Sequence, residues 1–175
     1  MSILESETIF NGRIITLNQE KVRLPNNQVD DLEIIHHPGG AAILALNDKQ
    51  EVCVLRQYRH AMKEWVWELP AGVLEKDDKS RLHRAKQELL EESGCTANDW
   101  KELGYIQSSP GVFTEKVYLY LATDLTVGEP SFEHGEVIEV HWLPFNELLE
   151  SATTGKISDA KTCVAIFRAA KILNL

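Results

Sequence analysis

The segment 81–94 constrains the fold of this chain more than any other stretch. At about 100° per residue, three apolar side chains fall on one stripe of a helix and should face a core: Leu82, Ala85 and Leu89. Gly94 is a typical residue just past a helix end, and either Asp78 or Ser80 is a suitable N-cap. The sequence therefore predicts an amphipathic helix that needs a second layer of structure to pack against.

The same helix carries three carboxylates near its C-terminal end. Glu88 and Glu92 are four residues apart and project together, and Glu91 lies on their outer flank. Like charges at this spacing cost about 0.2–0.5 kcal/mol per pair, and carboxylates at this end also oppose the helix dipole. A hard divalent cation bound by the carboxylate oxygens would reverse the sign of these terms. From the cluster alone, a solvated acidic face and a metal site both remain open.

Short extended runs surround the helix. Eight strands are expected, at residues 14–17, 32–35, 41–46, 51–59, 65–69, 101–107, 116–122 and 137–143. A short helix follows Pro144, and 160–173 is an amphipathic helix with Asp159 placed to cap it. This order predicts an α+β fold, in which a mixed β-sheet is packed between helices as an α/β/α sandwich, with an N-terminal β-rich segment.

Composition excludes several classes of partner. A formal net charge of −9 over 175 residues argues against nucleic acid, whose binders need clustered Lys and Arg. No apolar run approaches the roughly 20 residues of a membrane span, and the N-terminus lacks a signal-peptide pattern, so we expect a cytoplasmic protein. The three cysteines show no CxxC or metal-ligand spacing and are expected to be reduced packing residues: Cys53, Cys95 and Cys163.

Residues 68–72 (Glu-Leu-Pro-Ala-Gly) and 88–95 (Glu-Leu-Leu-Glu-Glu-Ser-Gly-Cys) together resemble the Nudix box, a loop–helix–loop motif. Three further stretches are similar to the branch of that family that hydrolyses ADP-ribose and related nucleotide sugars: 57–59, 108–111 and 136–140. The resemblance spans roughly residues 40 to 170. It implies a Nudix hydrolase domain over 41–175, preceded by N-terminal strands over 1–40 that join two chains in a homodimer.

The chain departs from the box in two places. Gln87 stands where the family usually has an Arg that helps to hold the glutamates, and Lys86 or Arg84 is available as a substitute. The stretch 72–88 is also one residue longer than usual. The upstream acidic position of the box then falls among three residues: Asp77, Asp78 and Lys79.

The resemblance implies a metal site. Glu88 and Glu92 would be the principal ligands of Mg²⁺, with Mn²⁺ as an alternative, and Glu91 would complete the cluster directly or through water. The backbone carbonyl of Ala71 would be a further ligand, and Gly72 would allow the close approach that this requires.

The remaining site residues follow from the same resemblance. Glu136 is the expected general base, and Glu133 is the second candidate for that role. The alternative for Glu136 is an exposed charge at the end of a loop. Glu91 is expected to take part in catalysis as well. Arg59, Glu68 and Pro110 are expected to bind substrate. The alternative for Arg59 and for Glu68 is a structural salt bridge, and the alternative for Pro110 is a turn. Trp65 and Trp67 fit base stacking, core packing or an interface.

The favoured function is metal-dependent hydrolysis of the pyrophosphate of a nucleoside diphosphate sugar, with ADP-ribose giving AMP and ribose 5-phosphate. One alternative keeps the reaction and changes the substrate to GDP-mannose or a UDP-sugar. A second, motivated by Gln87 and the longer loop, is a catalytically silent nucleotide sensor. A third is an interaction domain whose acidic helix is only surface.

Overall fold

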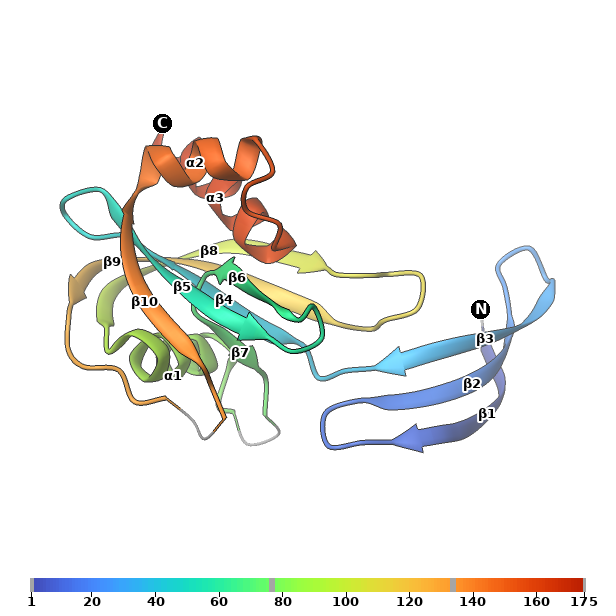
Figure 1. The fold of residues 1–175 in the computed structure, drawn as a ribbon. Coiled ribbons are helices and arrows are strands. Elements are labelled where there is room, and N and C mark those ends of the chain that lie inside the picture. Colours follow the sequence, from blue (N-terminus) through green and yellow to red (C-terminus); the bar gives the residue numbers. More distant parts are fainter. Residues whose placement is uncertain (1, 76–77, 133–134, 175) are drawn as a thin grey trace. The chain divides into compact units, whose positions relative to one another are not determined.

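A computed structural model describes residues 2–75, 78–132 and 135–174 of the chain (Figure 1). The chain forms two compact units, one of Met1–Gly39 with Gln107–Lys116 and the other of Gly40–Ile106 with Val117–Leu175. The predicted boundary places residues 107–116 in the domain that begins at residue 41, whereas in the structure they group with the N-terminal unit.

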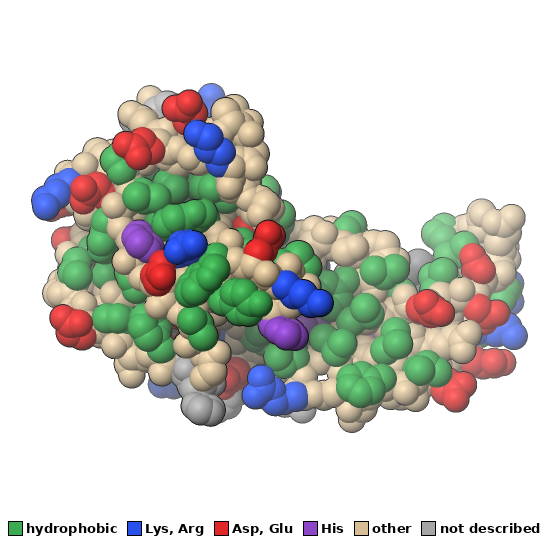
Figure 2. Space-filling model, viewed as in Figure 1, with side chains coloured by type: hydrophobic (Ala, Val, Ile, Leu, Met, Phe, Trp, Pro, Cys, Tyr) green, Lys and Arg blue, Asp and Glu red, His purple; other side chains and the backbone are tan. Residues whose placement is uncertain are grey.

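The first unit is an antiparallel three-stranded sheet in the order β1-β2-β3. Its strands are β1 (Ser2–Asn11), β2 (Thr16–Arg23) and β3 (Val29–His36). The sequence did not predict β1, because every described residue of that strand is exposed and no buried face imposes a pattern on it. Backbone pairing with β2 forms this strand instead. Figure 2 shows hydrophobic side chains on the surface of this sheet.

The second unit contains two sheets. One has four strands, in the order β7 (Ala71–Val73), β4 (Gly40–Ala45), β9 (Lys116–Thr126) and β8 (Thr96–Gln107). The other has three antiparallel strands, in the order β10 (Ile138–Pro144), β5 (Glu51–Arg59) and β6 (Glu64–Glu68). Strands β4 and β9 run parallel, whereas β7 pairs with β4 in the antiparallel sense, so the four-stranded sheet is mixed.

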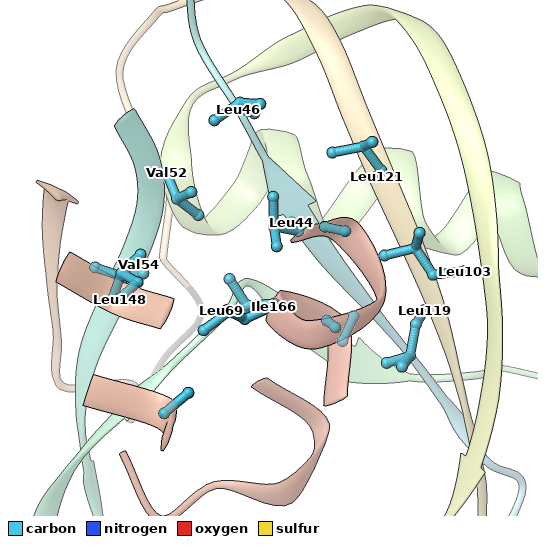
Figure 3. Close-up of a cluster of buried hydrophobic side chains, with 14 of the residues drawn as sticks. Leu44, Leu46, Val52, Val54, Leu69, Leu103, Leu119, Leu121, Leu148 and Ile166 are labelled. Atoms are coloured by element: carbon cyan, nitrogen blue, oxygen red, sulfur yellow. The ribbon is translucent and has the colours of Figure 1, made fainter. Parts of the chain in front are cut away.

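Three helices complete this unit: α1 (Arg81–Ser93), α2 (Phe145–Thr153) and α3 (Ala160–Leu173). Figure 1 shows α1 on one side of the sheets and the other two on the opposite side. The strand β4 is buried on both faces, and its alternate residues serve two cores. Ala42 and Leu44 face the α2–α3 side, where they join Leu148 and Ile166 (Figure 3).

The other residues of β4 face α1. Ile43 packs with Ala85 and Leu89 of that helix, which are fully buried. The amphipathic stripe of the sequence analysis is therefore a core contact. Sheets lie between helices, so the predicted α+β sandwich is confirmed. Within the described residues, none of the helices combines the length and the apolar character that crossing a bilayer requires.

Candidate active site

The helix α1 is fixed at both ends by its own sequence. Ser80 is the N-cap, and its Oγ accepts a hydrogen bond from the N–H of His83 at 3.0 Å. Of the two expected caps it is therefore Ser80 that acts, while Asp78 accepts from the N–H of Glu75 at 2.7 Å. Gly94 ends the helix with φ 71°, in the left-handed region that glycine adopts without strain.

Glu88 and Glu92 project from α1 onto one short turn of the chain. The N–H of Ala71 donates to Oε2 of Glu92 at 2.7 Å. A Cβ added at Gly72 would lie only 1.7 Å from Oε1 of Glu88, so the carboxylate occupies the space that the missing side chain leaves. Both carboxylates are buried, with 5% and 3% of their residues exposed. The absence of a side chain at Gly72 thus makes room for the Glu88 carboxylate, while the expected approach of the Ala71 carbonyl to a metal stays a prediction.

Burial strongly affects the charge of Glu92. The pKa of this carboxyl is raised from 4.5 to about 8, mainly by loss of hydration and in addition by the negative charges of Glu88 and Glu136. The hydrogen bond from Ala71 and the charge of Arg59 act in the other direction. An anion at this position needs a nearby cation to be stable at neutral pH.

Arg84 is the partner of Glu88. Its Nη2 lies 2.5 Å from Oε1 of Glu88, one helical turn away, and its Nη1 lies 3.7 Å from Glu75. Burial acts to lower the pKa of Arg84, but the charges of Glu88 and Glu75 outweigh it and raise the pKa. Of the two residues available in place of the family's usual Arg, it is Arg84 that pairs with Glu88. At that position the buried Oε1 of Gln87 finds no hydrogen-bond partner among the described residues.

Glu91 and Glu136 lie around this pair. Glu91 is half-buried, and its charge acts on Arg84. Its carbonyl accepts from the N–H of Ser131 at 2.7 Å, which ties the loop before β10 to the end of α1. Glu136, on that loop, is half-buried and close enough to raise the pKa of Glu92. Its place is compatible with the role of general base, which stays a prediction.

Glu68 and Arg59, both expected to bind substrate, are paired with each other. Nε and Nη2 of Arg59 donate to the two oxygens of Glu68 at 2.6 and 2.7 Å, a bidentate geometry. Nζ of Lys161 donates to the same carboxylate at 2.5 Å. Burial opposes the ionisation of Glu68, but Arg59 and Lys161 outweigh it and lower its pKa. The structural alternative, a salt bridge, is therefore present, while 42% of the Arg59 side chain remains exposed.

The donor set fits a hard cation. Two buried carboxylates meet at one turn, and carboxylate oxygens are the ligands that Mg²⁺ prefers. Within residues 2–75, 78–132 and 135–174, no three Asp, Glu, His or Cys side chains are grouped as a complete metal-binding cluster. The assignment of Ala71, Glu88, Glu91 and Glu92 as metal ligands accordingly remains a prediction.

Other expected residues lie elsewhere or outside the described residues. Pro110 belongs to the first unit, in a turn where the carbonyl of Ser109 accepts from two N–H groups, and its role stays a prediction. Trp67 packs against the core, whereas Trp65 is 38% exposed and lies beside Arg56, whose guanidinium carbon is 5.0 Å from its ring centroid. Glu133 and Asp77 are not among the described residues.

Two residues of α3 contact the site although the sequence analysis did not assign them to it. Lys161 and Thr162 contact residues 68–69 from more than 90 positions away in the chain. The capping role of Asp159 was predictable from local spacing, and its carboxylate does accept from the N–H of Thr162 at 3.0 Å. The contacts of Lys161 with Glu68 and of Thr162 with Leu69 depend on tertiary structure, for which the local pattern carries no signal.

Comparison with known proteins identifies the family to which the chain is similar. Residues 36–163 match the NUDIX domain, and residues 1–35 match the nucleoside diphosphate sugar hydrolase N-terminal domain. The chain is 35% identical over 165 residues to an ADP-ribose pyrophosphatase of Bacillus subtilis, covering 93% of this chain and 89% of that protein. It is 33% identical over 144 residues to a GDP-mannose pyrophosphatase of Cronobacter sakazakii, covering 77% and 74%.

The fold has a solved counterpart as well. The crystal structure of an ADP compounds hydrolase superposes with a TM-score of 0.84 at 20% identity, over 99% of this chain and 94% of that one. This likeness concerns the fold, whereas the domain match and the 35% identical relative confirm the expected family and the expected enzyme class. The chain is a member of the Nudix hydrolase family, a Nudix pyrophosphatase that carries the N-terminal domain of nucleoside diphosphate sugar hydrolases.

Proposed function

We propose that this protein hydrolyses the pyrophosphate bond of ADP-ribose, giving AMP and ribose 5-phosphate, with Mg²⁺ as the metal. The observation that carries the proposal is the burial of Glu88 and Glu92 against the Ala71–Gly72 turn. The Bacillus subtilis relative, an ADP-ribose pyrophosphatase, supports the choice of substrate.

In this proposal the chain holds a diphosphate beside buried anions. Glu88, Glu92 and the carbonyl of Ala71 would hold Mg²⁺, and Glu91 would complete the shell directly or through water. When bound, the metal neutralises phosphate charge and lowers the pKa of a bound water. Glu136 accepts a proton from a water whose oxygen bonds to one phosphorus; the bond from that phosphorus to the bridging oxygen breaks, and this oxygen leaves with the other phosphate, so that a nucleoside monophosphate and a sugar phosphate result. Arg59 contacts a phosphate or a ribose, held in place by Glu68.

A second substrate is supported by a specific observation. The Cronobacter sakazakii relative is a GDP-mannose pyrophosphatase, and its identity to this chain is 33% against 35% for the ADP-ribose enzyme. The reaction is the same, so the two candidates differ only in the base and the sugar that the pocket admits.

One assay separates these possibilities. Purified protein is incubated with ADP-ribose, GDP-mannose and a UDP-sugar, each with Mg²⁺, Mn²⁺ or EDTA, and the released nucleoside monophosphate is quantified. We expect AMP release from ADP-ribose with the highest kcat/KM and its loss in EDTA. A higher kcat/KM for GDP-mannose than for ADP-ribose would show that GDP-mannose is the better substrate and would contradict the choice of ADP-ribose. Tight binding without turnover would contradict the proposal and favour a sensor.

The assembly is a further part of the proposal. We expect a homodimer in which the sheet of the first unit contacts a second chain. Its exposed apolar side chains support this, because surfaces of this kind are commonly interfaces: Ile3 60%, Ile9 55% and Phe10 54%. The cytoplasmic location expected from the sequence remains a prediction.

A further inference from the structure

The first turn of α3 is hydrogen-bonded to the segment that precedes the Ala71–Gly72 turn. Oγ1 of Thr162 accepts from the N–H of Leu69 at 2.9 Å and donates to Oδ2 of Asp159 at 2.6 Å. Thr162 is fully buried, so its hydroxyl has exchanged water for these two partners. Removing this hydroxyl leaves the N–H of Leu69 without its acceptor, which is costly, whereas Asp159 keeps its hydrogen bond from the N–H of Thr162.

Lys161 makes a second connection beside the first. Its Nζ lies 3.0 Å from Oδ1 of Asp159 and 2.5 Å from Oε2 of Glu68. Glu68 in turn holds the guanidinium of Arg59 through two hydrogen bonds. The side chains of α3 therefore reach both the backbone of Leu69 and, through Glu68, the guanidinium of Arg59.

These contacts complete a row of restraints along residues 68–72. The carbonyl of Pro70 accepts from the N–H of Ile43 in β4 at 2.9 Å. Ala71 is held by Glu92, and Gly72 lies against Glu88. Residue 69 is two positions from residue 71, and the ring of Pro70 between them fixes one backbone dihedral, so few torsions are free to absorb a shift at residue 69.

We infer that Thr162 and Lys161 are positioning residues for the pyrophosphatase reaction, acting on two different parts of the site. Thr162 sets the 68–72 segment against the carboxylates of α1. Lys161 sets the orientation of Arg59 through Glu68. The inference rests on the proposed function in one respect, namely that Glu88, Glu92 and Arg59 form the site.

The two roles predict different kinetic changes. Thr162→Val keeps the shape of the side chain and removes the hydroxyl, and we expect kcat to fall about tenfold to a hundredfold with KM nearly unchanged, because small misplacements cost this much. Thr162→Ser keeps the hydroxyl and should restore most of the rate. Lys161→Met should raise KM by about tenfold while kcat is largely kept, since Arg59 is assigned to binding.

Amide hydrogen exchange of the metal-free protein gives a readout that does not depend on activity. Thr162→Val should speed exchange in the peptide that covers residues 68–72, and Thr162→Ser should not. Arg168→Met is the matched control, because Nη1 of Arg168 ties α3 to the carbonyls of Leu103 and Tyr105, at 2.8 and 3.2 Å, away from the turn. This control should leave both kcat and the exchange of 68–72 unchanged.

The outcomes are distinguishable. If the wild type hydrolyses no nucleotide sugar, the proposed function fails, while the exchange experiment still tests the positioning. If Thr162→Val and Arg168→Met give the same kcat and the same exchange, the positioning role of Thr162 is overturned. Should Thr162→Val not fold, Thr162→Ala takes its place, and a kcat and an exchange rate equal to those of Arg168→Met overturn the role of Thr162. Lys161→Met tests the second role separately, at a side chain that is 16% exposed, and an unchanged KM overturns the positioning role of Lys161.

Discussion

Glu92 is an acid whose surroundings resist its ionisation. Its pKa of about 8 reflects burial first and the neighbouring charges of Glu88 and Glu136 second. A folded-state pKa above the ordinary 4.5 means that the folded protein holds this proton more tightly than the unfolded chain does. The resulting stabilisation is fully present below pH 4.5 and is lost as pH rises through about 8.

Replacing this acid therefore has opposite effects on stability and activity. We expect metal-free Glu92→Gln to be at least as stable as the wild type at pH 8.5, because Gln needs no proton, and its melting temperature to vary less between pH 5 and pH 8.5. Hydrolysis with Mg²⁺ should fall by at least about a hundredfold, since a metal ligand supplies several kcal/mol to the transition state. Calorimetric melting and a steady-state assay measure the two effects.

The control for Glu92→Gln is Glu150→Gln, which removes one negative charge from an exposed position on α2. It should change neither the pH dependence of melting nor the rate. A Glu92→Gln variant as active as the wild type would refute the metal role of this residue.

At the scale of the element, α1 performs two tasks with different faces. Ala85 and Leu89 bury one face against β4, and Glu88 with Arg84 forms a charged pair on the neighbouring face. The helix has no acidic residue in its first turn and no basic residue in its last turn. Negative charge on Glu91 or Glu92 opposes the helix dipole at the C-terminal end. The core contact therefore has to stabilise a helix that its charge pattern disfavours.

The Arg84–Glu88 pair gives the prediction at this scale. Their side chains are 11% and 6% exposed, so Arg84→Met leaves a buried carboxylate without its cation. We expect a loss of about 3–5 kcal/mol in the free energy of unfolding of the metal-free protein, with a smaller loss for Arg84→Lys. Urea denaturation measures both.

Arg81→Met, on the same helix, is the matched comparison. Arg81 lies over the ring of Tyr118 at 3.8 Å, a contact worth about 0.5–1 kcal/mol at an exposed site. Equal losses for Arg81→Met and Arg84→Met would show that the pair with Glu88 has no special importance for stability.

At the scale of the whole molecule, the first unit exposes several large apolar side chains on a small sheet, among them Ile3, Ile9 and Phe10. The proposed homodimer buries them. We expect Phe10→Glu to shift the protein from dimer to monomer, because it places a charge within a buried apolar interface. Light scattering coupled to size exclusion measures the mass directly.

Phe167→Glu makes the same change at a residue of α3 that is 43% exposed in the other unit. It should remain a dimer. A wild-type protein that runs as a monomer at micromolar concentration, or a Phe10→Glu variant that keeps the dimer mass, would contradict the assembly.

Local pattern determined much of this protein. The helix at residues 81–93, the cap at Asp159 and the strand at residues 51–59 all lie where periodicity and capping chemistry predicted them. The box spacing also identified the Nudix family, because two motifs 16 residues apart are visible in the chain without any knowledge of its contacts. The strand β1 escaped prediction because its described residues are all exposed.

Only the tertiary structure decided which groups meet at the site. Arg84, rather than Lys86, pairs with Glu88, and the choice depends on how the helix rotates against β4. Arg59 and Glu68 bind each other because β5 and β6 are neighbouring strands, and Lys161 and Thr162 join them because the first turn of α3 reaches residues 68 and 69 at the end of β6. Helical and strand periodicity act over a few residues, whereas these contacts join residues up to 93 apart, and long-range packing alone fixes such distances.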